Sequence, residues 1–330
     1  MSESQGPRKL PEFRKPEQSG SPQKTFKSLG ILLVLVCLVF LTIFWGIGWL
    51  AREDLTATEL YSRSLDGRQD SKRMAAIEWG RRLHLYESRG QKSDVSRLSP
   101  DPLQSKRLAE IVRASLKFGG SNAEQVDAIY LGGLVTVIGF SRFAPPALLD
   151  LEALLSEIPV REWTELQIPI LLALARLQSP VSKVSEERLL KVLSEDDPAL
   201  RKTAVFTVGV LAQSSESRDF FRARVLELCS DPVSDVRWNS GFTLGRWRDP
   251  QAQPVLKELV DLAERVRRDG HINGEESGVL TESLLLSMDQ AFRLIGESPD
   301  SELAQKLAVI SREHPHLKIR QAAISALKTR

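Results

Sequence analysis

The chain has 330 residues, with 45 basic and 43 acidic side chains and a formal net charge of +2. Hydrophobic residues make up 42% of the sequence and charged residues 27%, which excludes a wholly disordered chain. Aromatic residues make up only 6% and alternating β-branched runs are few, which disfavours sandwiches and barrels and predicts an all-α fold.

Residues 1–28 are predicted to form a disordered, basic, cytoplasmic tail. Prolines recur there among Ser, Gln, Lys and Arg residues, at Pro7, Pro11, Pro16 and Pro22. Such a composition cannot bury enough apolar surface to offset the entropy lost on folding.

Residues 29–51 are predicted to form one transmembrane helix. The 22 residues Leu29–Leu50 carry no charge, and a helix of that length spans the roughly 30 Å hydrocarbon core of a bilayer. Trp45 and Trp49 lie near one end, where interfacial aromatic residues are common. The alternatives are a buried globular helix and a cleaved signal peptide. A signal peptide is disfavoured because its apolar region is shorter and ends in a small-x-small site.

Basic residues flanking the span predict its orientation. The twenty residues after the span contain Arg52, Arg63 and Arg68, and six basic residues precede it: Arg8, Lys9, Arg14, Lys15, Lys24 and Lys27. The positive-inside rule then places the N-terminus in the cytoplasm and the C-terminal part in the periplasm, with the span in the inner (cytoplasmic) membrane. A cytoplasm-facing adaptor with reversed topology is the alternative.

Residues 52–330 are predicted to form helix pairs. A degenerate repeat lies around Gly80, residues 90–102 read as a loop or linker, and Pro145-Pro146 reads as a break. Gly132-Gly133 indicates tight packing inside the solenoid. The helices expected before residue 180 are 53–64, 103–118, one helix or pair over 123–140, 148–155 and 165–177.

The strongest repeat lies in Asp197–Trp247, where one pattern occurs twice. Asp197-Pro198 opens a helix that continues through Arg201, Ala204 and Gly209. Asp is a favourable N-cap and Pro is tolerated in the first helical turn. The second copy has Asp231, Pro232, Arg237, Ser240, Gly241 and Gly245.

The small residue of this pattern recurs along the chain with a nearly constant period. Gly139, Ala175, Gly209 and Gly245 are spaced by 36, 34 and 36 residues. A period in this range is typical of helical solenoids. The next step, to Gly296, is 51 residues, so an insertion is expected around 267–278. The last pair is expected over residues 301–312 and 317–328.

The pattern D-P-x-x-R-x-x-A-x-x-x-x-G-x-L resembles the second helix of HEAT repeats, especially the short HEAT-like (PBS-lyase-type) repeats of bacterial proteins. It fits Asp197–Leu211 closely and the second copy with drift at Trp238–Gly241. The resemblance implies an α-solenoid, and the spacing predicts that Arg201 and Arg237 each reach an acidic residue or a carbonyl of an adjacent repeat.

The sequence offers little catalytic chemistry. Cys37 lies in the predicted span, and Cys229 is then a lone thiol expected to be a small core residue. HEAT-like hydroxylases carry repeated His-Glu pairs that hold iron, but no histidine here precedes a glutamate. No metal site, cofactor or small-molecule substrate is therefore predicted at the four histidines: His84, His271, His314 and His316. His314 and His316 are expected to be exposed at a turn.

Nucleic-acid binding is also disfavoured. The first 50 residues hold six basic and three acidic residues, which leaves 39 basic against 40 acidic for residues 51–330. A DNA-binding face normally shows a basic excess.

The sequence therefore predicts a non-enzymatic, membrane-anchored scaffold that binds another protein through the concave surface of its solenoid. A HEAT-like enzyme of the lyase type is the alternative. The candidate partner-binding residues are Arg201, Arg237, Trp238, Arg268 and His271.

Overall fold

The computed structural model describes residues 55–119, 127–141, 144–158, 163–269, 282–297 and 301–328. The chain divides into the units Met1–Leu55 and Thr56–Arg330, and all the described helices belong to the second. The predicted tail and transmembrane helix lie outside the described residues. No helix among those described has both the length and the apolar character that crossing a bilayer requires.

In the described part of the chain the regular secondary structure is helical, and the helices form seven pairs. Two short elements accompany the pairs: α4 (Lys92–Leu98) packs on α3, and the 3₁₀ turn η2 (Pro250–Ala252) precedes α13. The pairs are α2 (Ala57–Leu65) with α3 (Gln69–Ser88), α5 (Pro102–Gly119) with α6 (Ala128–Ile138), α7 (Ala144–Glu157) with α8 (Thr164–Leu177), α9 (Lys183–Val192) with α10 (Pro198–Leu211), α11 (Ser215–Leu228) with α12 (Ser234–Arg246), α13 (Gln253–Asp269) with α14 (Glu282–Glu297), and α15 (Ser301–Glu313) with α16 (Leu317–Lys328).

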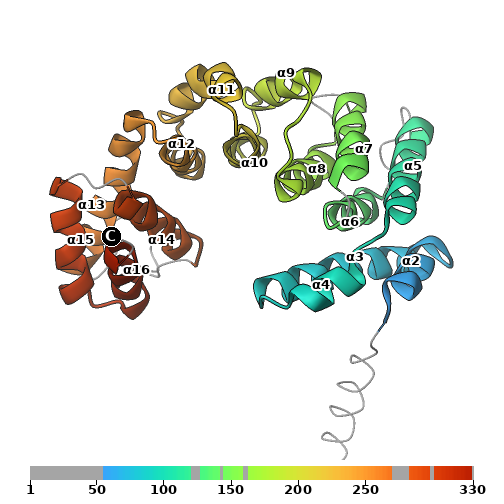
Figure 1. The fold of residues 1–330 in the computed structure, drawn as a ribbon, viewed down its shortest axis with the longest axis horizontal. Coiled ribbons are helices and arrows are strands. Elements are labelled where there is room, and N and C mark those ends of the chain that lie inside the picture. Colours follow the sequence, from blue (N-terminus) through green and yellow to red (C-terminus); the bar gives the residue numbers. More distant parts are fainter. Residues whose placement is uncertain are drawn as a thin grey trace, which may run out of the picture. The chain divides into compact units, whose positions relative to one another are not determined.

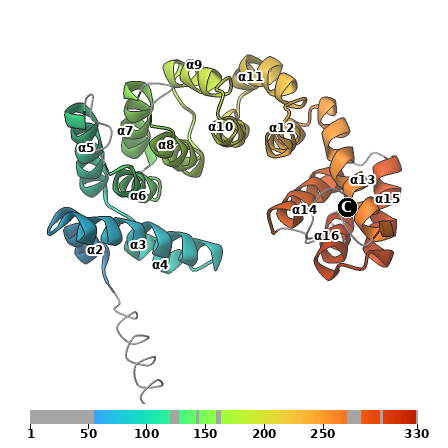
Figure 2. The same ribbon diagram turned by 180° about the vertical axis from the view of Figure 1, so that it is seen from behind.

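Along the chain, the first helices of neighbouring pairs stack on one another, and so do the second helices (Figures 1 and 2). The first helices α5, α7, α9 and α11 form one row, which we call row A. The second helices α3, α6, α8, α10, α12, α14 and α16 pack each on the next and form row B. This stacking of helix pairs confirms the predicted α-solenoid.

The periodic glycines lie where row B helices approach most closely. A Cβ atom at Gly139 would lie 2.8 Å from the Ala173 Cα atom, and one at Gly209 would overlap the Thr243 side chain. A Cβ at Gly245 would lie 2.9 Å from Leu294. In each case the residue that the glycine approaches lies two positions before the next small residue of the period: Ala173 before Ala175, Thr243 before Gly245, and Leu294 before Gly296. The predicted spacing of the small residues therefore continues as far as Gly296.

Two buried threonines hold neighbouring row B helices together in a way that the sequence analysis did not anticipate. Thr243 Oγ1 donates to Val205 O at 3.1 Å. Thr207 Oγ1 lies 3.1 Å from Leu171 O and 2.8 Å from Thr203 O of its own helix, so the two carbonyls share its one hydrogen. Both residues are fully buried. The pairs of residues repeat with the period of the solenoid, so the bonds are part of the repeat.

Two segments predicted to interrupt the helices are themselves helical. The predicted loop 90–102 contains α4, because Trp79 on α3 is fully buried and its Nε1 donates to Leu98 O at 2.8 Å. Pro145-Pro146 lies in the first turn of α7, where a missing N–H leaves no helical bond unmade. The predicted insertion begins as helix, since α13 runs to Asp269.

The prediction that His314 is exposed is wrong. The side chain is fully buried, its Nδ1 accepts from the His316 backbone N–H at 3.0 Å, and its Nε2 lies 3.2 Å from Ala263 O. The imidazole is therefore neutral with its proton on Nε2, and it joins α13 to the turn before α16. Burial lowers the pKa of His314, which keeps it neutral.

Candidate functional site

Arg201 and Arg237 join successive repeats, as predicted. Arg201 donates to both carboxylate oxygens of Asp231, at 2.8 and 3.1 Å, and Arg237 donates to Glu258 at 2.8 Å. Each guanidinium also donates to the carbonyl six residues earlier, on Glu195 and Asp231 respectively. These hydrogen bonds connect the start of each helix to the loop before it and to the following repeat, so both arginines are structural.

Asp231 is the shared partner of the two arginines. Burial alone would raise the pKa of its carboxyl group, but hydrogen bonds from Arg201 and from the Val233 N–H outweigh burial and lower it. Only 5% of the Asp231 side chain and 12% of the Arg201 side chain are exposed. A pair this buried is held in place and does not offer a surface for a partner.

The other predicted site residues do not converge with these. Trp238 is half-buried on α12, and its buried Nε1 has no acceptor within the described ranges. Arg268 is exposed on α13 and lines a hollow against α15 in which Lys306 pairs with Asp261 at 2.7 Å. His271 lies outside the described residues. The structure therefore does not gather the four described residues of this set into one site.

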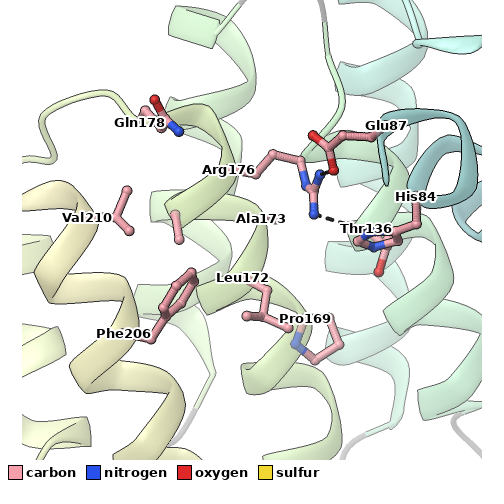
Figure 3. Close-up of a pocket in the computed structure, with 11 residues that line it drawn as sticks. His84, Glu87, Thr136, Pro169, Leu172, Ala173, Arg176, Gln178, Phe206 and Val210 are labelled. Atoms are coloured by element: carbon pink, nitrogen blue, oxygen red, sulfur yellow. Dashed lines mark hydrogen bonds and ion pairs between the residues drawn. The ribbon is translucent and has the colours of Figure 1, made fainter. Parts of the chain in front are cut away.

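A different site lies on row B, between α3 and α10 (Figure 3). It is a cavity of about 400 Å³, and its lining residues all come from row B helices or from the residue that follows α8. Its apolar side includes Leu172, of which 43% is exposed. The lining residues are His84, Glu87, Thr136, Pro169, Leu172, Ala173, Ala175, Arg176, Gln178, Phe206 and Val210.

Polar groups meet at one side of this cavity. The Arg176 guanidinium forms an ion pair with Glu87 through Nη1 and donates from Nη2 to His84 Nδ1 at 3.3 Å (Figure 3). It also lies 4.0 Å from the centroid of the Phe140 ring, and His84 packs edge-on against the same ring. Burial and, to a smaller extent, the Arg176 charge lower the pKa of His84, which favours the neutral ring. Because a guanidinium can only donate, Nδ1 of that ring is the acceptor.

Arg246 occupies the matching position two row B helices further along. It is half-buried at the end of α12, with its guanidinium 5.5 Å from the centroid of the Phe206 ring. Within the described residues it has no hydrogen-bond or ion-pair partner. Burial lowers the pKa of its guanidinium, because the charge has lost solvent without gaining a counter-ion.

Phe140, Arg176 and Arg246 occupy equivalent positions in different repeats. Phe140, Arg176, Val210 and Arg246 each follow directly after the small residue of the period. The small residues are predictable from their period, but the position beside them is not, because the side chains there differ from repeat to repeat. Two of the four residues at this position, Arg176 and Val210, line the cavity.

The described residues contain no group of three or more His, Cys, Asp or Glu side chains arranged to hold a metal ion. Cys229 is half-buried at the end of α11, and burial raises the pKa of its thiol to about 11. The thiol is therefore protonated at neutral pH, as a small packing residue would be.

Part of the chain matches a known repeat family, and solved structures are similar to the chain at low identity. A family model described as HEAT repeats matches residues 186–271. A designed armadillo repeat protein in complex with the peptide (KR)4 is similar at 16% identity and a TM-score of 0.37, over 67% of this chain and 98% of that one. An engineered protein is similar at 12% identity and a TM-score of 0.37, over 82% of this chain and 97% of that one. No curated protein matches the chain. The residues matched by the HEAT-repeat model run from within α9 to just beyond α13 and include the Asp197–Trp247 repeat.

Proposed function

We propose that this chain is a membrane-anchored scaffold that binds another protein on row B, at the cavity around Leu172 and Arg176. The observation that carries the proposal is the composition of that cavity. It combines the exposed Leu172 and half-buried apolar side chains with convergent polar groups, which is the usual character of a binding pocket.

Exposed apolar residues alone do not select row B. Row A also exposes large hydrophobic side chains, including Leu149 at 67% and Val184 at 66%. Scattered exposure of this kind is ordinary on a protein surface. The cavity is what distinguishes row B, because Leu172 there lies among Pro169, Phe206 and Val210, with Arg176 beside them.

The anchor and its orientation are part of the proposal. The uncharged Leu29–Leu50 span supports a single-pass inner-membrane protein, and the basic residues before it support a cytoplasmic N-terminus with the helix pairs in the periplasm. Alkaline phosphatase and green fluorescent protein fused in turn to the C-terminus test the orientation. Phosphatase activity with no fluorescence is expected, and fluorescence with no phosphatase activity would contradict it.

Capture of the partner from detergent-solubilised membranes tests the binding face. The tagged full chain is compared with its Leu172→Glu and Leu149→Glu variants. Both substitutions place a charge at an exposed position, so both should fold. We expect Leu172→Glu to lose the partner and Leu149→Glu to keep it. Equal recovery by both variants would rule out the row B cavity.

A further inference from the structure

The proposed function does not say what kind of protein segment binds at row B. The residues at the C-terminal ends of the row B helices indicate the character of that segment. The last seven residues of α6, α8, α10 and α12 contain two charged side chains, Arg176 and Arg246. Between these two positions in the row lie Phe206 and Val210 of α10. The surface therefore has a cation on each side of an apolar strip.

Both arginines have hydrogen-bonding capacity to spare. A guanidinium has five N–H donors, and the contacts of Arg176 use two of them. Its ion pair with Glu87 is weak because 49% of the Glu87 side chain is exposed, so a partner carboxylate can replace Glu87 at little cost. Arg246 has no carboxylate partner among the described residues, although its charge is half-buried.

Stacking on aromatic rings orients both groups. A guanidinium that lies over a ring face keeps its N–H edges free for a carboxylate. Arg176 stacks in this way on Phe140 at 4.0 Å, and Arg246 lies over Phe206 at 5.5 Å. The apolar strip between them offers contact to one apolar side chain of a partner.

We infer that this strip binds an extended acidic segment of a protein partner, with one carboxylate at Arg176, one at Arg246 and an apolar side chain between them. The inference rests on the proposed function. The two arginines are separated by two helix-to-helix steps of about 8–10 Å each, or roughly 16–20 Å. An extended chain advances about 3.3 Å per residue, so the two acidic residues are about five or six positions apart.

A pair of matched peptides tests the inference. The acidic probe is fluorescein-labelled, end-capped Asp-Ser-Phe-Ser-Ser-Asp, and the neutral probe replaces both Asp residues with Asn. Fluorescence anisotropy measures their binding to the full chain in detergent. We expect the acidic probe to bind at least about fivefold more tightly, and the difference to shrink as salt is raised.

Variants assign the difference to the two arginines. Arg246→Gln and Arg176→Gln should each weaken the acidic probe about threefold or more and change the neutral probe less than about twofold. Arg248→Gln is the matched control, since Arg248 is exposed two residues further along and should change neither probe.

Several outcomes would overturn the inference. Equal affinity for the two probes would do so, and so would a ratio that neither arginine variant changes, because the arginines would then only complement the negative ends of their helices. A ten-nucleotide single-stranded oligonucleotide that binds with the same dependence on Arg246 would exclude a protein segment as the preferred ligand. If the probes fail while Leu172→Glu still abolishes partner capture, the acidic class is wrong and the row B site stands.

Discussion

The starts and the ends of the row B helices use arginine in opposite ways. At the starts, Arg201, Arg237 and Arg320 each donate to the carbonyl six residues earlier, and the first two also pair with an acidic residue of the following repeat unit. At the ends, Arg176 and Arg246 lie over aromatic rings, and the cavity is lined by Arg176 and by Phe206, the ring under Arg246. The same residue type is structural in one region and available for binding in the other.

In a solenoid, residues that recur in each repeat have a different role from residues that vary between repeats. An arginine that recurs at one register position makes the same contact in each repeat, so repetition marks the contacts that hold neighbours together. The position after the periodic small residue varies between Phe, Arg, Val and Arg. Variation at a position whose side chains help to line a cavity is where specificity for a partner can reside.

The largest effect is expected at a helix start. Arg201→Met removes the partner of a buried carboxylate and the donor to two carbonyls, which should lower the free energy of unfolding by about 3 kcal/mol. Arg176→Met is the comparison at a helix end and should cost less than about 1 kcal/mol. Urea unfolding of both variants measures the difference, and equal losses would contradict the assignment of roles.

A smaller loss is expected at a close helix contact. Gly139→Val places a side chain against the Ala173 backbone, and overpacking of this kind costs about 2 kcal/mol. Ala199→Val, at an exposed position on α10, is the control and should cost well under 1 kcal/mol. If thermal unfolding shows no difference between the two, the helices are not in close contact at residue 139.

The pH dependence of stability tests one helix start separately. The backbone carbonyl of His314 accepts a hydrogen bond from Arg320 at the start of α16. Burial lowers the folded-state pKa of His314, so the neutral form stabilises the fold above the unfolded pKa of about 6.5, and this stability is lost as pH falls toward the folded pKa. Stability should therefore fall between pH 7.5 and 5.5. His314→Gln should lose less over the same range, and an identical pH dependence would show that His314 does not titrate there.

The smallest effect on stability is expected at Arg246. Arg246→Met keeps the apolar stem over Phe206 and removes a charge that has no described partner, so unfolding should change by less than about 0.5 kcal/mol. Differential scanning calorimetry measures this directly. A loss as large as that of Arg201→Met would make Arg246 another structural arginine and remove the contrast between starts and ends.

The sequence predicted the fold through features that repeat. The Asp197-Pro198 start, the periodic glycines and the contacts of Arg201 and Arg237 are confirmed, because each follows from local capping, close packing or fixed spacing. The prediction failed at Lys92–Leu98 and at His314, where a single tertiary contact decides the conformation or the burial.

The candidate site was not predictable in the same way. Its residues come from α3, α6, α8 and α10, and nothing in the local sequence of His84 or Glu87 indicates that they meet Arg176, which follows about 90 positions later. Trp238 and Arg268 were selected for their residue type, and the structure places them apart from the cavity. The predicted tail, the anchor at Leu29–Leu50 and His271 lie outside the described residues and stay predictions.

Site-specific photo-crosslinking tests the central claim most directly. A benzoylphenylalanine placed at Leu172 on row B, and in a second protein at Leu149 on row A of the same helix pair, is irradiated in intact membranes. The row B site predicts a discrete crosslinked protein from position 172 and none from position 149. Crosslinks from position 149 alone would place the partner on row A and contradict the account.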